Sequence, residues 1–171
     1  VTLEDFDIAD AIFSFGHNPG TNHPRMLGTL REVSRRGGNI VAINPLKERG
    51  LERFQDPQAA VEMMTNGSTP ISRYYFQPNV GGDYALMFGM LKHLREWDIQ
   101  TLAAGKKSVF DRSFIEMNTV GFDAMMEEID STAWSDIHTH TGLSPEHLES
   151  LAKMYLDAKT AIFCWGMGIT Q

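Results

Sequence analysis

The sequence is poor in cysteine and has no long hydrophobic run. Cys164 is the only cysteine among 171 residues, so an internal disulfide framework is excluded, and we expect a protein of a reducing, cytoplasmic setting. No stretch approaches the roughly 20 apolar residues that cross a bilayer, and the N-terminus lacks the layout of a signal peptide. We therefore expect no membrane partner.

The sequence also has no excess of basic residues. The chain carries 15 Lys and Arg against 22 Asp and Glu, which gives a formal net charge of -7. Such a balance argues against general affinity for nucleic acid or anionic lipid. The hydrophobic content of 42% is ordinary for a globular protein, so the sequence predicts one domain with a small-molecule partner.

The ends of the sequence indicate a piece of a longer polypeptide. Val1 is not a natural initiator, and the chain stops at Gln171 shortly after an apparent strand, "TAIFCWG". We expect an internal fragment that binds the rest of its parent chain.

A β-strand, helix and second β-strand follow one another at the start. "DAIFSFG" (10–16) is a short apolar run ending on glycine, and "NIVAINP" (39–45) is a second run broken by proline. Between them, "RMLGTLREVSRRGG" (25–38) carries an apolar stripe at helical spacing and ends on two glycines. This order predicts a right-handed βαβ unit.

The remaining chain reads as an irregular stretch, several helices and a last strand. Residues 45–82 lack periodicity, apart from a short helix over 57–64. A helix capped by Asp83 is predicted over 82–97, a small helical insertion over 98–143, and a helix begun by Ser144 and Pro145 over 144–159. "TAIFCWGMG" (160–168) predicts a third buried strand. The whole chain, 1–171, is predicted as an α/β domain, a three-layer Rossmann-like parallel sheet flanked by helices.

Three loops should meet at the carboxyl edge of this sheet, where parallel sheets bind ligands. The first loop (16–25) is "GHNPGTNHPR", whose glycine, amide and hydroxyl groups precede a helix with free N–H groups near His23 and Pro24. The second loop (43–50) is "INPLKERG", with Asn44, Lys47 and Arg49. The third loop (165–171) is "WGMGITQ", in which Met167 lies between two glycines. A phosphate-bearing ligand would suit all three.

A nicotinamide dinucleotide is the first alternative for such a site. Asn44 with Lys47 would resemble a pocket for a ribose 2′-phosphate, but the first loop has the glycine spacing G-x-x-x-G instead of G-x-G-x-x-G. The spacing argues against plain NAD(P) binding.

Four ordered motifs carry a more specific resemblance that spans nearly the whole chain. "FSFGHNPGTNHPR", "IVAINPLKERG", "GGDYALMFGML" and "AIFCWGMGITQ" resemble the molybdopterin oxidoreductase family, the formate dehydrogenase alpha subunit and dimethyl sulfoxide reductase type. Within it, the chain resembles a formate dehydrogenase-like branch of oxidoreductases that is associated with acid resistance.

The resemblance implies a bis(molybdopterin guanine dinucleotide) molybdenum cofactor, of which this domain would bind one dinucleotide. Three groups of residues would line it. The phosphate and pterin side would be formed by Gly16, His17, Asn18, Thr21, Asn22 and His23. The guanosine side would be formed by Asn44, Pro45, Lys47, Gln77, Pro78, Gly81, Gly82 and Asp83. The pterin and metal would be approached by Gly166, Met167, Gly168 and Gln171. Many members carry aspartate in place of Asn44, and an amide there could still bond a ribose hydroxyl.

The resemblance also implies what this chain does not supply. The family's molybdenum ligand lies in a preceding segment, and some members hold a 4Fe-4S cluster with an N-terminal cysteine group; Cys164 corresponds to neither. We therefore expect no metal ligand and no catalytic residue in this fragment, which should be inactive alone, with Gln171 near the metal. The substrate would be a small molecule, formate by analogy. A nucleotide-binding module for NADP or a guanine nucleotide, without molybdenum chemistry, is the alternative.

Other chemistry-bearing residues have simpler interpretations. His138 and His140 in "HTH" have no third ligand at diagnostic spacing, so they predict no metal site. The acidic run "MEEID" reads as an exposed helix face, and Cys164 as a buried, inert thiol.

Overall fold

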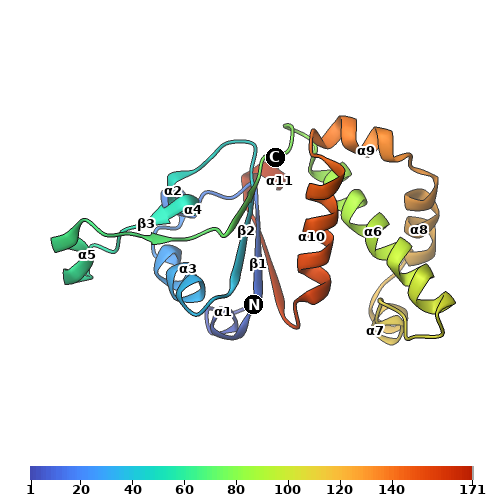
Figure 1. Ribbon diagram of the computed structural model, residues 1–171, viewed down its shortest axis with the longest axis horizontal. Coiled ribbons are helices and arrows are strands. Elements are labelled where there is room, and N and C mark those ends of the chain that lie inside the picture. The colour runs from blue at the N-terminus through green and yellow to red at the C-terminus, as the bar shows by residue number, and fades with distance from the viewer. Residues whose placement is uncertain (171) are drawn as a thin grey trace. The chain divides into compact units, whose positions relative to one another are not determined.

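The computed structural model describes residues 1–170, which fall into two compact units (Figure 1). The sheet unit comprises Val1–Gln77 and Ala158–Gln171, and the helical unit comprises Pro78–Asp157. Each unit is described by itself below.

The sheet unit contains a four-stranded parallel sheet with the strand order β5-β2-β1-β6. The strands are β1 (Ala11–Phe15), β2 (Asn39–Ile43), β5 (Tyr74–Phe76) and β6 (Ala161–Trp165). All five residues of β1 are buried, because it lies between two neighbours; Phe13 pairs with Val41 on one side and Phe163 on the other. Helices flank this parallel sheet, so the predicted α/β class is confirmed.

Two helices of the sheet unit contribute to its core. Phe6 of α1 (Asp5–Ile8) and Leu30 of α3 (Met26–Arg35) cluster with Ile12, Ile40 and Ile162 from the three longest strands. Burying side chains of this size contributes about 1.5–3 kcal/mol each before entropy costs. The predicted βαβ unit is therefore confirmed, with its apolar helix stripe against the core.

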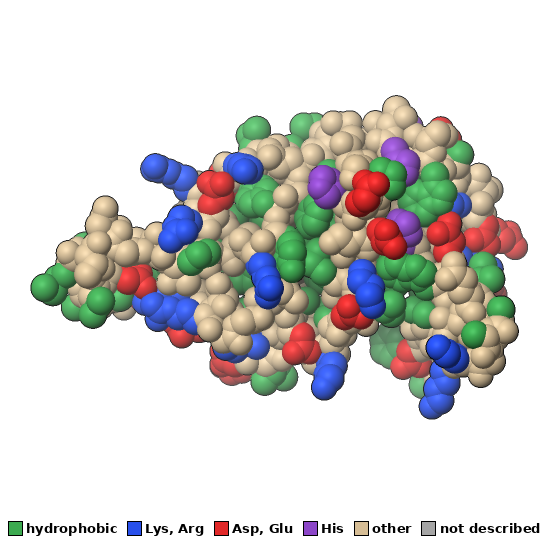
Figure 2. All heavy atoms as spheres, viewed as in Figure 1, with side chains coloured by type: hydrophobic (Ala, Val, Ile, Leu, Met, Phe, Trp, Pro, Cys, Tyr) green, Lys and Arg blue, Asp and Glu red, His purple; other side chains and the backbone are tan. Residues whose placement is uncertain are grey.

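The stretch 45–82 is more ordered than the sequence predicts. It contains α4 (Arg49–Glu52), an antiparallel pair of β3 (Arg53–Phe54) and β4 (Thr69–Pro70), α5 (Ala60–Thr65), and the sheet strand β5. The short predicted helix is confirmed as α5, which projects from the sheet unit with exposed hydrophobic side chains at its tip (Figures 1 and 2). The prediction of a largely irregular stretch was wrong, because strands of two or three residues are too short to show alternation.

The last strand also differs from its prediction. Among residues 1–170, β6 pairs only with β1 and forms one edge of the sheet. It is therefore not a buried strand: Trp165 is 57% exposed and Cys164 is half-buried. Partial burial still raises the pKa of the Cys164 thiol to about 11, which agrees with an inert cysteine. After β6 the chain turns into the short helix α11 (Met167–Thr170).

The helical unit consists of five helices, where the sequence predicts helices over 82–97 and 144–159 with a helical insertion between them. The five helices are α6 (Asp83–Ala103), α7 (Arg112–Asn118), α8 (Phe122–Ser131), α9 (Trp134–Thr141) and α10 (Pro145–Asp157). The predicted start of α10 is confirmed, since Ser144 Oγ accepts a hydrogen bond from the N–H of His147 at 3.3 Å. The predicted cap of α6 was wrong: Gly82 is the N-cap, and Asp83 is the first helical residue. No helix among residues 1–170 is long and apolar enough to span a membrane.

Candidate functional site

The first and third loops meet at the carboxyl edge of the sheet through two glycines. Gly16 has φ +52°, and a Cβ placed on it would lie 2.9 Å from the Cα of Gly168. A Cβ on Gly168 would in turn lie 2.8 Å from the Cα of Gly16. No side chain fits at either position, so both glycines are needed for backbone to pack on backbone. The predicted meeting of these loops is confirmed.

The first and second loops are joined in the same way and by a side chain. Gly20 lies in α2 (Pro19–Asn22), and a Cβ on Gly50 would stand 2.7 Å from its Cα. Asn18 Nδ2 donates a 2.7 Å hydrogen bond to Glu48 Oε2, and Asn18 Oδ1 accepts from the N–H of Thr21. The side chain of Asn18 therefore holds two loops together. Sequence reasoning missed Glu48, whose only signal is a charge inside a candidate loop.

The second loop is also anchored to the end of β5. Gln77 Nε2 donates to the carbonyl of Pro45 at 2.9 Å. The Tyr75 hydroxyl donates to the carbonyl of Leu46 at 2.7 Å and accepts from the N–H of Glu48 at 2.9 Å. Burial raises the pKa of Tyr75, while hydrogen bonds from Glu48 N–H and the buried Asn44 lower it less. The loop is thus held rigidly on two sides.

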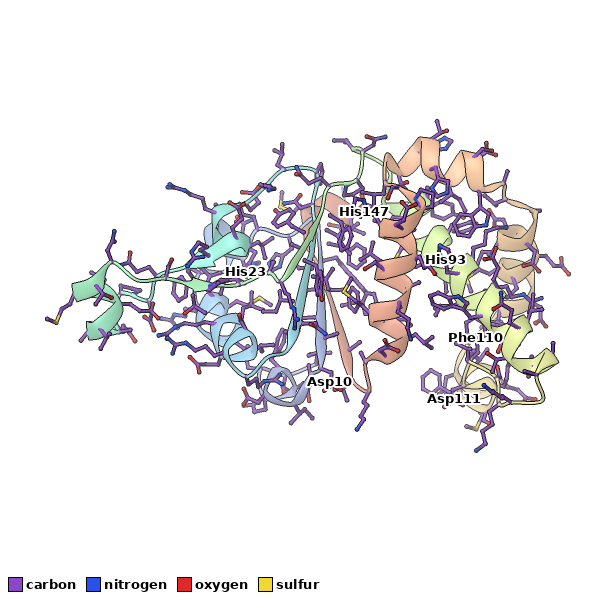
Figure 3. All side chains as sticks on the ribbon, in the orientation of Figure 1. Asp10, His23, His93, Phe110, Asp111 and His147 are labelled. Carbon is purple, nitrogen blue, oxygen red and sulfur yellow. The ribbon has the colours of Figure 1, made fainter. Side chains whose placement is uncertain are left out.

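Two histidines of the first loop form a pair that the sequence did not predict. His17 Nε2 lies 3.1 Å from His23 Nδ1, so one ring donates to the other (Figure 3 labels His23). His17 is 7% exposed, and burial, followed by the neighbouring His23, lowers its pKa. Its Nδ1 is buried without a hydrogen-bond partner in the described chain. The neutral His17 ring therefore keeps one nitrogen for a further partner.

The helix that follows the first loop differs from the expected anion site. α3 begins at Met26, and the N–H groups of Met26 and Leu27 already donate to the carbonyls of His23 and Pro24. The prediction of free N–H groups at its start was therefore wrong for these two residues. The exposed polar groups of the loop come instead from Thr21, Asn22 and His23.

The cationic side chains of the second loop point to solvent. Lys47 is 58% exposed, with its Nζ 4.0 Å from Glu52 Oε1, and Arg49 is also exposed. An ion pair this exposed contributes little, so both cations remain available to an anionic ligand.

Several candidate residues belong to the helical unit or lie at its start. Pro78 is buried and Gly81 has φ +80°. Gly82 packs against the end of α9, where a Cβ would lie 2.7 Å from the carbonyl oxygen of His140. Burial raises the pKa of Asp83, an effect that a backbone hydrogen bond partly offsets. Within this unit, close packing accounts for the glycine at 82.

The third loop contributes the remaining candidates. Gly166 lies against His17, and Met167 is 63% exposed. Gln171 lies outside the described residues. No group of three or more His, Cys, Asp or Glu side chains in residues 1–170 could hold a metal ion.

Fold and site together define an α/β domain of the class that binds ligands at the carboxyl ends of parallel strands. No family model matches the chain. It is 48% identical over 171 residues to Protein YdeP of Escherichia coli strain K12, covering all of this chain and 22% of that protein. It is 37% identical to the uncharacterized oxidoreductase Mb2924c of Mycobacterium bovis, covering all of this chain and 21% of that protein.

More distant relatives carry assigned names. Formate dehydrogenase H of Escherichia coli is 26% identical over 169 residues, which cover 99% of this chain and 20% of the enzyme. Acetylene hydratase from Pelobacter acetylenicus shares the fold, with a TM-score of 0.70 at 18% identity, over 95% of this chain and 19% of that one. The chain spans about a fifth of the length of each protein. These relatives confirm the resemblance to the molybdopterin oxidoreductase family.

Proposed function

We propose that this chain is the molybdopterin guanine dinucleotide-binding domain of a molybdenum-dependent, formate dehydrogenase-like oxidoreductase. The observation that carries the proposal is the joining of the three loops at one sheet edge by the contacts of Gly16 with Gly168 and of Asn18 with Glu48. The relationship to formate dehydrogenase H supports the choice of ligand. In the whole enzyme, formate is the first substrate to test.

The residues at this edge fit the chemistry of a pterin linked through phosphates to a nucleoside. Such a ligand needs hydrogen-bonding groups, a few cations and backbone without side chains in the way. His17 offers a buried nitrogen without a partner, Thr21 and Asn22 offer exposed polar groups, and Lys47 and Arg49 offer positive charge. We assign the phosphates to the first loop and the guanosine to Asn44, Lys47 and Gln77. When bound, the cofactor would supply a molybdenum centre tuned by its pterin sulfur ligands.

The chain's own residues would act by position and by charge. Asn18 would hold the first loop in place through Glu48, since both of its amide atoms already have protein partners. Lys47 would orient the guanosine end from the exposed side. Because the metal ligand is expected in another segment, this chain alone would bind cofactor without turnover, in a cytoplasmic enzyme.

Elemental analysis of the longer parent protein tests the proposal. Purified from cells that make the pterin cofactor, it should contain molybdenum in near-stoichiometric amount and release a guanine nucleotide on acid treatment. Lys47→Ala and Asn18→Ala should each lower the molybdenum content, whereas Lys106→Ala, an exposed lysine in the helical unit, should not. A parent protein that carries no molybdenum but binds GDP or NADP would refute the proposal in favour of a nucleotide-binding module.

A further inference from the structure

A separate cavity lies within the helical unit. It has a volume of about 280 Å³ and opens between α6, α8 and α9. Its apolar lining comes from Ala85, Phe88 and Ile137, and its polar lining from the side chains of Tyr84, Glu128, Thr132, Asp136 and His140. Only Gly81 is shared with the candidate residues above, so the cavity is a distinct feature of this unit.

Every side-chain donor in the lining is already used within the protein. The Tyr84 hydroxyl donates to Glu128 Oε1 at 3.2 Å, and the Thr132 hydroxyl donates to the carbonyl of Glu128 at 2.7 Å. His140 Nδ1 lies 2.7 Å from the carbonyl of Asp136. Because a carbonyl can only accept, Nδ1 carries the hydrogen, and in the tautomer with that single ring hydrogen Nε2 is an acceptor. No lining side chain therefore has a donor left for a ligand.

The groups that remain are acceptors, and two of them are anionic. Glu128 keeps a second carboxylate oxygen, and Asp136 adds another carboxylate from the first turn of α9. In the described chain, neither carboxylate forms an ion pair with a Lys or Arg, and no Lys or Arg lines the cavity. The polar part of the cavity thus favours a ligand that carries N–H donors and positive charge.

The apolar part of the cavity favours a flat ligand. The rings of Tyr84 and Phe88, one turn apart on α6, have centroids 4.4 Å apart and are tilted by 33°. An aromatic pair offers its faces to a planar ring and to a cation. We propose that this cavity binds a planar organic cation, such as an amidinium or guanidinium on an aromatic body, with the cationic end on Glu128 and Asp136 and the ring on Tyr84 and Phe88.

Calorimetric titration with benzamidinium tests this site directly. Benzamidinium should bind at low salt, and the uncharged isostere benzamide should bind at least about tenfold more weakly because it cannot pair with a carboxylate. Glu128→Gln preserves the shape of the side chain and should weaken benzamidinium binding by about tenfold. Glu127→Gln, which removes a neighbouring charge from α8 outside this cavity, is the matched control and should leave binding unchanged.

Three results would overturn the proposal. Binding of benzamide as tightly as benzamidinium would reduce the effect to apolar contact. Equal weakening of binding by Glu128→Gln and Glu127→Gln would reduce it to net charge. Tighter binding of Nα-acetylarginine amide than of benzamidinium would mean that the cavity accepts a protein side chain in place of a flat free ligand. Far-UV circular dichroism confirms that each variant is folded. None of these measurements depends on molybdenum, so failure here leaves the proposed function untouched.

Discussion

Close approach of two backbones decides which residues are possible at the candidate site. Gly20 and Gly50 meet so closely that a Cβ on Gly50 would lie 2.7 Å from backbone that cannot move aside cheaply. A histidine pair and an Asn–Glu hydrogen bond add to the same loops. The edge is therefore shaped by steric exclusion first and by polar contacts second.

Gly50→Ala should destabilise the protein by about 1–3 kcal/mol, because the added methyl group forces the first and second loops apart. Gly28→Ala is the control: Gly28 lies inside α3 with nothing within 4 Å of its would-be Cβ, so alanine should stabilise by about 0.5–1 kcal/mol. Urea unfolding followed by circular dichroism measures both changes. If Gly50→Ala leaves the free energy of unfolding unchanged or raises it as Gly28→Ala does, the close contact between Gly20 and Gly50 is contradicted.

At the scale of elements, the hairpin-like stretch that carries α5 is held to the sheet unit by a buried ionic network. Arg31 of α3 is 8% exposed and donates to Asp56 at 2.7 Å and to Glu62 at 2.8 Å. Arg35 adds a 2.7 Å pair to the same Glu62. Backbone hydrogen bonding from Asp56 and the Arg31 guanidinium lower the pKa of Glu62, so it stays ionised. The network ties residues 53–70 to α3.

Arg31→Ala should lower the free energy of unfolding by about 3 kcal/mol, because Asp56 and Glu62 lose the cation that compensates their burial. Hydrogen exchange should speed up most in α5 and the β3–β4 pair. Arg35→Ala is the comparison. It should lower the free energy of unfolding by less than about 1 kcal/mol, since Arg35 is half-exposed and its removal leaves the ion pair of Arg31 with Glu62 in place. Unchanged exchange in α5 after loss of Arg31 would show that the apolar contacts alone hold this stretch.

The longer helices were predictable from the sequence because their signals are local, whereas the four-residue helices α1, α2, α4 and α11 were not predicted. The stripe of α3, the Ser144–Pro145 start of α10 and the short helices between residues 112 and 141 all depend on neighbours within a turn or two. β5 was not predictable, since its three residues gain their structure from pairing with β2. The edge position of β6 likewise depends on strand order, which periodicity does not contain.

The candidate site also has features that the sequence predicts and features that depend on tertiary packing. That three loops meet follows from parallel topology, because every strand's carboxyl end lies at one edge. The partners within the site are separated by up to about 150 residues along the chain, as with Gly16 and Gly168, and depend on tertiary packing. For this reason the sequence predicted Asn18, His17 and His23 as candidates but neither the Asn18–Glu48 bond nor the histidine pair.

At the scale of the whole molecule, each unit contains a histidine whose pKa is lowered by its surroundings: His17 is buried and His93 is partly buried. His17 belongs to the sheet unit, and His93 of α6 belongs to the helical unit. Burial lowers the pKa of His93; Glu96 of α6 and Glu149 of α10 raise it, and His138 of α9 lowers it further. Its ring lies between Trp97 and Trp134, with centroids 5.6 and 4.5 Å away.

Acid should therefore destabilise both units. A histidine whose pKa is lower in the folded than in the unfolded protein stabilises the folded state. This contribution is fully present above the unfolded pKa of about 6.5, and it is lost as the pH falls from there through the folded pKa. The free energy of unfolding should decline between about pH 7 and pH 5, before most carboxylates titrate.

His17→Gln and His93→Gln should each flatten the decline, and the double variant should flatten it most. With Trp165 of the sheet unit replaced by phenylalanine, tryptophan fluorescence follows the helical unit through Trp97 and Trp134, and circular dichroism follows the chain. The exposed His140 serves as the control: if His140→Gln flattens the profile as much as His93→Gln does, burial is not the cause of the acid sensitivity.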